Sequence, residues 1–205
     1  MPRIIAGALG GRTIASPPSS RTRPTSDRVR ESLFGRLDAW GVLRGAHVLD
    51  LFGGTGALAF EALSRGAGSA VIVEAHGPTA QVIRRSAEDL GLTDQVSVIT
   101  GRAESVIRTL NPSAGPAASA VFLDPPYTVP LAHIADLLEQ LSAAGVLADE
   151  AVIVIEHSGR TDEQLRLGPE FVDEGAKQYG DTAVEFFTYL DPRISAAGTG
   201  DMLGQ

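Results

Sequence analysis

Short apolar runs alternate with longer segments whose apolar residues recur at helical spacing over the middle of the chain. Each short run predicts a strand, and each longer segment predicts a helix. The predicted strands are residues 47–51, 69–74, 96–100, 118–124 and 150–156. The predicted helices between them are residues 57–65, 78–90, 103–110 and 131–143. This alternation is typical of a doubly wound α/β fold built on a parallel sheet.

The two ends of the chain depart from this alternation. Residues 171–177 and 183–190 predict two strands with no helix between them, and so short a connection favours antiparallel pairing. Near the N-terminus, short alternating segments around several glycines predict a β-hairpin over residues 3–14. The sequence therefore predicts a seven-stranded, mostly parallel sheet with an antiparallel edge. The expected divisions are a hairpin appendage at 1–20, a main domain at 21–192 and a disordered tail at 193–205.

A further helix is predicted between the hairpin and the first parallel strand. Its apolar positions fall at helical spacing, and Thr25 or Ser26 supplies an N-cap before them. Gly41 lies just past its predicted end. These apolar positions are Val29, Leu33, Phe34 and Leu37.

Composition excludes several kinds of site. The 205 residues include no Cys, which rules out disulfides, thiolate zinc sites and cysteine nucleophiles. Four scattered His residues do not suggest a metal site, so no metal is expected. No apolar run is long enough to span a bilayer, and the N-terminus lacks the apolar region of a signal peptide. We expect a cytoplasmic monomer with no membrane contact.

Positive charge is concentrated at the start of an acidic chain. The net charge is −8, yet residues 1–44 carry +5 and the remainder carries −13. A basic segment on an acidic body favours local contact with nucleic-acid phosphates over a merely solvated face. All the basic residues of this segment are Arg, which forks onto phosphate and stacks on bases. The predicted RNA contacts are Arg3, Arg12, Arg21, Arg23, Arg28 and Arg30.

The segment Asp124-Pro125-Pro126-Tyr127 follows an apolar strand and ends it, because proline has no N–H to donate to a sheet. In open α/β sheets, ligands bind at the carboxyl ends of the strands. There the Asp124 carboxylate and the Pro125 carbonyl could accept both N–H bonds of a nucleobase amine, and Tyr127 could stack on the base. The alternative is a proline-rich turn without chemistry.

A glycine turn follows the first parallel strand. Gly53-Gly54-Thr55-Gly56 lets the backbone approach a ligand closely, and Glu74, at the end of the next strand, could take a ribose hydroxyl. The spacing also suits a dinucleotide-binding dehydrogenase. Asp50 disfavours that alternative, because its carboxylate would repel a pyrophosphate but attract an ammonium group. A bare β-α turn is the remaining alternative.

These segments resemble a known family. Residues 48–56 resemble the cofactor loop of Rossmann-like S-adenosylmethionine-dependent methyltransferases, and residues 124–127 resemble the DPPY motif of their amino-group branch. Residues 23–34 are similar to the N-terminal segment of the small-subunit (16S) ribosomal RNA guanine-N2 methyltransferases. Residues 3–7 and 179–182 fit that family as well. The resemblance implies a Rossmann-like fold and covers about residues 3–190.

The resemblance also implies roles for individual residues. Asp50, Phe52 and the turn Gly53-Gly54-Thr55-Gly56 would hold the methionine end of S-adenosylmethionine, and Glu74 its ribose. Arg102 and Ala103 would flank the adenine. The catalytic segment would be Asp124-Pro125-Pro126-Tyr127.

The implied activity is methyl transfer from S-adenosylmethionine to the N2 amine of a guanine in 16S ribosomal RNA. The amine would attack the methyl group directly in line, without a strong general base, and the partner would be ribosomal RNA within small-subunit particles. Two alternatives remain. An adenine-N6 methyltransferase on DNA or RNA would use the same acceptors, and a non-catalytic RNA-binding or assembly module would share the fold.

Overall fold

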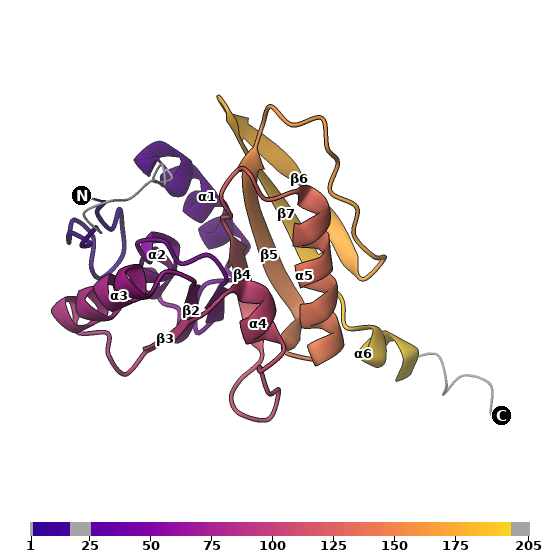
Figure 1. The fold of residues 1–205 in the computed structure, drawn as a ribbon, viewed down its shortest axis with the longest axis horizontal. Helices are drawn as coiled ribbons and strands as arrows, with labels where there is room; N and C mark the ends of the chain where they lie inside the picture. The colour runs from indigo at the N-terminus through magenta and orange to yellow at the C-terminus, as the bar shows by residue number, and fades with distance from the viewer. Residues whose placement is uncertain (1, 17–25, 198–205) are drawn as a thin grey trace.

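The computed structural model describes residues 2–16 and 26–197, and its centre is one seven-stranded sheet (Figure 1). The strand order is β3-β2-β1-β4-β5-β7-β6. Strands β3, β2, β1, β4 and β5 are parallel, and β7 runs antiparallel between β5 and β6. The strands are β1 (His47–Asp50), β2 (Ser69–Glu74), β3 (Val96–Thr100), β4 (Ala118–Leu123), β5 (Leu147–Ser158), β6 (Phe171–Tyr179) and β7 (Thr182–Tyr189). This arrangement confirms the predicted fold class.

Helices cover both faces of the sheet (Figure 1). One face packs against α1 (Asp27–Trp40), α2 (Ala57–Ser64) and α3 (Gly77–Leu90), and the other packs against α4 (Ala103–Ile107) and α5 (Leu131–Ala144). Adjacent residues of β4 show the division, because Phe122 belongs to the first hydrophobic core and Val121 to the second. Side chains of a strand alternate between faces, so both faces of β4 are apolar.

Strand β1 lies between β2 and β4. From β1 the chain continues to β2 on one side of the sheet, whereas from β4 it continues to β5 on the other side. Such a reversal of strand order opens a crevice at the carboxyl ends of the strands. The parallel register pairs Asp50 with Phe122, which places Asp124 two residues beyond the level of Asp50. The fold therefore brings the glycine turn and the DPPY segment to one edge.

Helix α1 begins as its sequence predicts. The Ser26 side chain accepts a hydrogen bond from the Val29 backbone N–H, and Gly41 adopts φ +72° at the other end of the helix. Its apolar side packs on the sheet, with the rings of Phe34 and Phe122 at 5.7 Å between centroids. Ser26 is thus the cap, rather than Thr25, which lies outside the described residues.

The N-terminal hairpin shares the main core. Its arms pair through a bridge between Arg3 and Thr13, and Ile4 and Ile14 are fully buried. The Glu61 carboxylate, also fully buried on α2, accepts hydrogen bonds from the Ile5 and Ala6 backbone N–H groups at 2.7 and 3.1 Å. The appendage predicted at 1–20 therefore packs as part of the domain over its described residues, and the boundary predicted at residue 20 lies outside them.

The C-terminal expectation needs one correction. A further helix, α6 (Pro192–Ala197), begins at the last residue of the predicted main domain and continues into the predicted disordered tail, residues 193–205. Asp191 holds its start, because the carboxylate accepts hydrogen bonds from the Arg193 backbone N–H and guanidinium. The rest of the predicted tail lies outside the described residues. Within residues 2–16 and 26–197, no helix is long and apolar enough to cross a membrane.

We expect Glu61→Gln to destabilise the fold by about 2–3 kcal/mol, because the amide would place an N–H group against buried donors. The donors are the hairpin backbone and the Arg65 guanidinium, whose Nε lies 2.7 Å from Glu61 Oε1. Urea unfolding measures the change. Glu88→Gln, at an exposed position on α3, is the matched control and should stay within about 0.5 kcal/mol. Equal stability of the two variants would contradict the role of Glu61 as the anchor of the hairpin.

Candidate active site

The glycine turn after β1 forms a close backbone cradle. A Cβ added at Gly53 would lie 2.5 Å from Ile72 Cγ2, and one added at Gly56 would lie 2.6 Å from the Phe60 ring. Gly54 and Gly56 have φ values of +54° and +79°, which favour glycine. Thr55, between them, is half-buried. The turn therefore packs so closely on β2, α2 and α3 that Gly53 and Gly56 have no room for a side chain.

Glu74 holds this turn in place from the end of β2. Its Oε2 accepts a hydrogen bond from the Gly54 N–H at 2.9 Å, and its Oε1 accepts one from the His76 N–H at 2.7 Å. Each carboxylate oxygen keeps a second lone pair, so Glu74 can still accept hydrogen bonds from two ribose hydroxyls. The structure thus adds a second role for Glu74, as the support of the glycine turn.

Asp50 is a buried acid at the carboxyl end of β1. Its side chain is 1% exposed, and its Oδ1 accepts a hydrogen bond from the Phe52 N–H at 3.2 Å. The pKa of Asp50 is raised to about 7, mainly by burial and to a smaller extent by the charges of Asp124 and Glu74, while the hydrogen bond from Phe52 opposes this rise. Ionised Asp50 therefore favours a cation nearby. Phe52 itself is half-buried and packs against the second core.

The DPPY segment leaves the sheet beside this acid. Pro125 is buried, whereas Tyr127 is 45% exposed and Asp124 is half-buried. The turn closes on itself through a hydrogen bond from the Val129 N–H to the Pro126 carbonyl. An aromatic ring and a carboxylate therefore lie together at the open edge, next to the cation-favouring site of Asp50.

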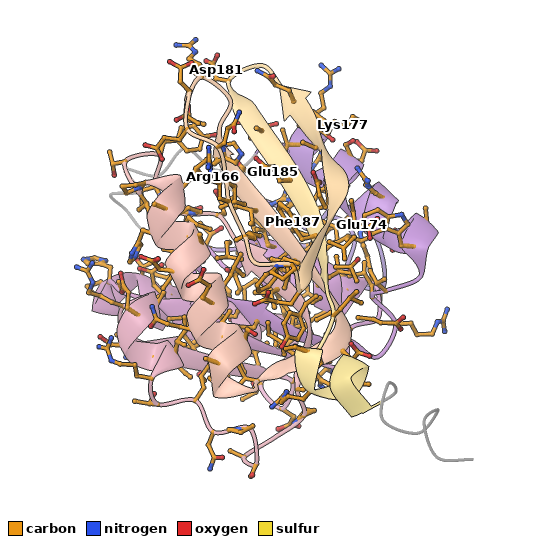
Figure 2. All side chains as sticks on the ribbon, turned by 90° about the vertical axis from the view of Figure 1, so that its right-hand side faces the viewer. Arg166, Glu174, Lys177, Asp181, Glu185 and Phe187 are labelled. Atoms are coloured by element: carbon orange, nitrogen blue, oxygen red, sulfur yellow. The ribbon has the colours of Figure 1, made fainter. Side chains whose placement is uncertain are left out.

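Tyr127 forms a hydrogen bond to a residue of β7. Its hydroxyl shares a hydrogen bond of 2.7 Å with Thr182 Oγ1, at the start of β7. The next residue back, Asp181, lies at the tip of the β6–β7 turn (Figure 2) and forms a forked ion pair with Arg160 at 2.6 and 2.7 Å. The role of Thr182 was not predicted, although residues 179–182 fitted the family pattern. Its partner is 55 residues away, so no local signal identifies the contact.

A second unpredicted pair lies beneath the same loop. His157 on β5 hydrogen-bonds through Nε2 to Glu185 Oε1 at 2.7 Å. This bond is the main cause that raises the pKa of His157 above its ordinary value, against the opposing effect of burial. His157 also lines a small pocket of about 80 Å³ together with Pro125, Pro126 and Tyr127. The pair therefore supports the loop from the side of α5.

The other end of the crevice has an arginine where the adenine is expected. Arg102 follows β3 and is the N-cap residue of α4, and its exposed side chain pairs weakly with Glu104 at 3.4 Å. Glu104 also hydrogen-bonds to His133 Nε2 at 2.7 Å. Ala103 is buried under this cluster. The Arg102 side chain is thus directed towards Glu104, and the Ala103 side chain is buried.

The predicted RNA-contacting arginines do not lie together. Arg28 is exposed at the start of α1, and Arg3 is exposed beside it in an ion pair with Asp27. Arg12 donates to the Asp89 carbonyl near the C-terminal end of α3, which lies away from the crevice because α3 begins there. Arg21 and Arg23 lie outside the described residues.

The prediction for Arg30 is wrong. Its side chain is 1% exposed, and its guanidinium donates to the Arg3 carbonyl at 2.7 Å and to Asp27 at 2.8 Å. Burial lowers the pKa of Arg30, against the charges of Asp27 and Glu61. This arginine holds the hairpin to α1 and is not available to RNA.

Comparisons with known proteins identify relatives of this chain. The family described as "conserved hypothetical protein 95" matches residues 2–188. Ribosomal RNA small subunit methyltransferase D of Escherichia coli (strain K12) is 37% identical over 154 residues, which cover 75% of this chain and 73% of that protein.

Solved structures share the fold. The Escherichia coli protein yhhF superposes with a TM-score of 0.79 at 30% identity, over 92% of this chain and 98% of that one. An RNA methyltransferase from Salinibacter ruber, in complex with S-adenosyl-L-homocysteine, has a TM-score of 0.59 at 19% identity, over 82% and 95% of the two chains. The second likeness concerns the fold alone. The match over residues 2–188 and the 37% identity together show that this chain belongs to the ribosomal RNA small subunit methyltransferase D family.

Proposed function

We propose that this protein transfers a methyl group from S-adenosylmethionine to the exocyclic N2 amine of a guanine in 16S ribosomal RNA. The family supports S-adenosylmethionine-dependent methylation of ribosomal RNA as the activity. The observation that carries the proposal further is the pairing of two sites at one edge. A buried acid that favours a cation lies beside a carboxylate and an aromatic ring suited to a base.

The residues around β1 and β2 fit the cofactor. Its ammonium group suits ionised Asp50, and its ribose hydroxyls suit the remaining lone pairs of Glu74. Close approach is possible at Gly54, where an added Cβ would meet only the Phe52 carbonyl oxygen, at 3.8 Å. When bound, the cofactor supplies a methyl group on a positively charged sulfur. The acidic surroundings, Asp50, Glu74 and Asp124, attract that charge.

The DPPY segment would hold the amine. The Asp124 carboxylate and the Pro125 carbonyl accept its two N–H bonds, which localises the nitrogen lone pair, and Tyr127 stacks on the base. Holding the two reacting atoms in line removes most of the entropy cost of their encounter and lowers the activation barrier by several kcal/mol. The target base must leave its stack to reach Tyr127, which favours an RNA loop.

Ribosomal RNA within small-subunit particles is the proposed substrate. Arg3 and Arg28, both exposed at the N-terminal end of α1, support contact with its phosphates. For Arg12 to contact the same RNA, the RNA would have to extend along α3 to its C-terminal end. The test is methyl transfer from labelled cofactor to small-subunit particles, naked 16S ribosomal RNA and DNA, with the modified base identified. N2-methylguanine in the RNA supports the proposal, whereas N6-methyladenine in any substrate contradicts it.

Catalysis should separate from cofactor binding. Asp124→Ala removes an acceptor for the amine, so we expect turnover to fall by at least a hundredfold while cofactor affinity stays within about threefold. Glu74→Ala should instead weaken cofactor affinity, because the ribose acceptor and the support of Gly54 are both lost. Calorimetry and single-turnover rates measure the two effects. A near-normal rate for Asp124→Ala would contradict the catalytic role.

Cofactor affinity should depend on the ionisation of Asp50. Its pKa of about 7 means that the free protein holds a proton there at lower pH, and this proton must leave before the ammonium group binds. We therefore expect affinity to weaken about fivefold from pH 7 to pH 6. Asp50→Asn should bind weakly and lose this pH dependence, whereas the exposed control Asp89→Asn should keep it. Calorimetric titration between pH 5.5 and pH 7.5 measures the slope, and an unchanged slope in Asp50→Asn would overturn the assignment.

Tyr127 should act mainly through its ring. Tyr127→Phe and Thr182→Val each remove the same hydrogen bond, so each should lower kcat/KM only a few-fold, and the double variant should be no worse than either one. Tyr127→Ala should lose roughly 1–3 kcal/mol of base stacking, or about one to two decades of kcat/KM. Steady-state kinetics on the RNA substrate test this. If the Phe variant were as impaired as the Ala variant, the hydroxyl would be the essential group.

A further inference from the structure

A groove of about 350 Å³ lies between the start of α1 and the β6–β7 turn. We name it the hairpin groove after the β6–β7 hairpin, which is distinct from the N-terminal hairpin. It is lined by Ser26, Arg28, Val29, Gln178, Tyr179 and Gly180. Its volume falls within the usual range of small-ligand sites. None of these six residues belongs to the cofactor or amine-binding sites described above.

The walls of the groove are held together by polar contacts. The Tyr179 hydroxyl donates to Ser32 Oγ on α1 at 2.6 Å, and Lys177 Nζ donates to the same oxygen at 2.9 Å. Figure 2 shows Lys177 on the side of β6 that faces α1. The Gln178 amide donates to the Gly159 and Gly180 carbonyls at 3.3 and 3.1 Å. These contacts fix the β6–β7 turn relative to α1, so the groove is already formed in the free protein.

Two acidic residues near the groove are already paired with arginines. Asp27 is engaged by Arg3 and Arg30, and Asp181 by Arg160. The exposed Arg28 guanidinium lies among the lining residues, and the Lys177 ammonium lies 5.3 Å from the centre of the Tyr179 ring. A cationic group, an aromatic ring and an amide around one groove match the phosphate, base and sugar of a nucleotide.

The groove is also connected to the catalytic segment. Tyr179 pairs with Thr182 across the β6–β7 turn, and Thr182 shares its hydroxyl hydrogen bond with Tyr127. A nucleotide in the groove would therefore lie one short turn away from a base stacked on Tyr127. When one base of a single strand is turned out of the stack, the next nucleotide stays close to it. A subsite for that nucleotide must therefore lie near Tyr127, as the hairpin groove does.

We propose that the hairpin groove binds a nucleotide of the RNA that flanks the target guanine. Its phosphate meets Arg28 and its base lies against Tyr179. This inference rests on the proposed function and adds a second RNA-binding subsite to it. The groove would then select single-stranded RNA around the target and position the base at Tyr127.

Two exposed positions test the groove with little risk to the fold. Arg28→Gln removes the phosphate contact. Gly180→Asn adds a side chain to a lining residue of the groove. The fold should tolerate it, because an added Cβ at Gly180 meets no atom within 4 Å and Asn tolerates the φ of +60°. Arg85→Gln, at an exposed position on α3, is the matched control for the loss of one positive charge. Binding of naked 16S ribosomal RNA is measured across a salt series, and KM and kcat are measured separately on small-subunit particles.

We expect Arg28→Gln to weaken RNA binding roughly tenfold and to reduce the log–log salt slope by about 1, with KM raised accordingly. Gly180→Asn should also raise KM, and both variants should bind the cofactor normally. The inference is overturned if the Arg28 and Arg85 variants behave alike, or if Gly180→Asn lowers thermal stability without changing RNA binding. The latter result would mean that the chain itself fills the groove. The binding series needs no turnover, so it decides the inference even if no methyl transfer to guanine is found.

Discussion

The burial of Asp50 at the carboxyl end of β1 is the constraint on which the site depends. β1 lies between β2 and β4, so the acids that follow those strands, Glu74 and Asp124, lie on either side of it. A carboxylate removed from water and placed near like charges is unfavourable in the free protein. A cationic ligand relieves this cost. The same strand order that completes the sheet therefore prepares the crevice for a positively charged cofactor.

The substrate side of the site depends on contacts across the sheet. The loop that carries Tyr127 is tied to β7 by Thr182, and the N-terminus of α5 is tied to the β5–β6 connection because the Leu131 N–H donates to Glu163 at 2.7 Å. The ion pair of Arg160 with Asp181 fixes that connection to the β6–β7 turn. The mechanism we propose depends on positioning and needs such support, because a loosely held acceptor would not align the attacking nitrogen.

The N-terminal hairpin shows how charge and structure divide within one segment. The arginines of the hairpin and of α1 lie in one basic stretch, yet they serve different purposes. Arg30 is buried and joins α1 to the hairpin, Arg12 closes onto the α3 carbonyl of Asp89, and Arg28 remains exposed beside the hairpin groove. Since Ile4 and Ile14 lie in the main core, the hairpin stabilises the domain as well as presenting charge.

Local patterns in the sequence determined most of the strands and helices, and they brought the two segments of the candidate site to one edge of the sheet. Apolar periodicity placed β2 and β3 at the residues observed, and the capping chemistry of Ser26 placed the start of α1, because these depend on neighbours within a few residues. The proline pair and the glycine turn located the edge for the same reason. Only the tertiary structure decided that Arg30 is buried, that residues 192–197 form a helix and that Tyr127 meets Thr182. Burial and long-range pairing depend on which surfaces the packed elements cover, and no short stretch of sequence contains that information.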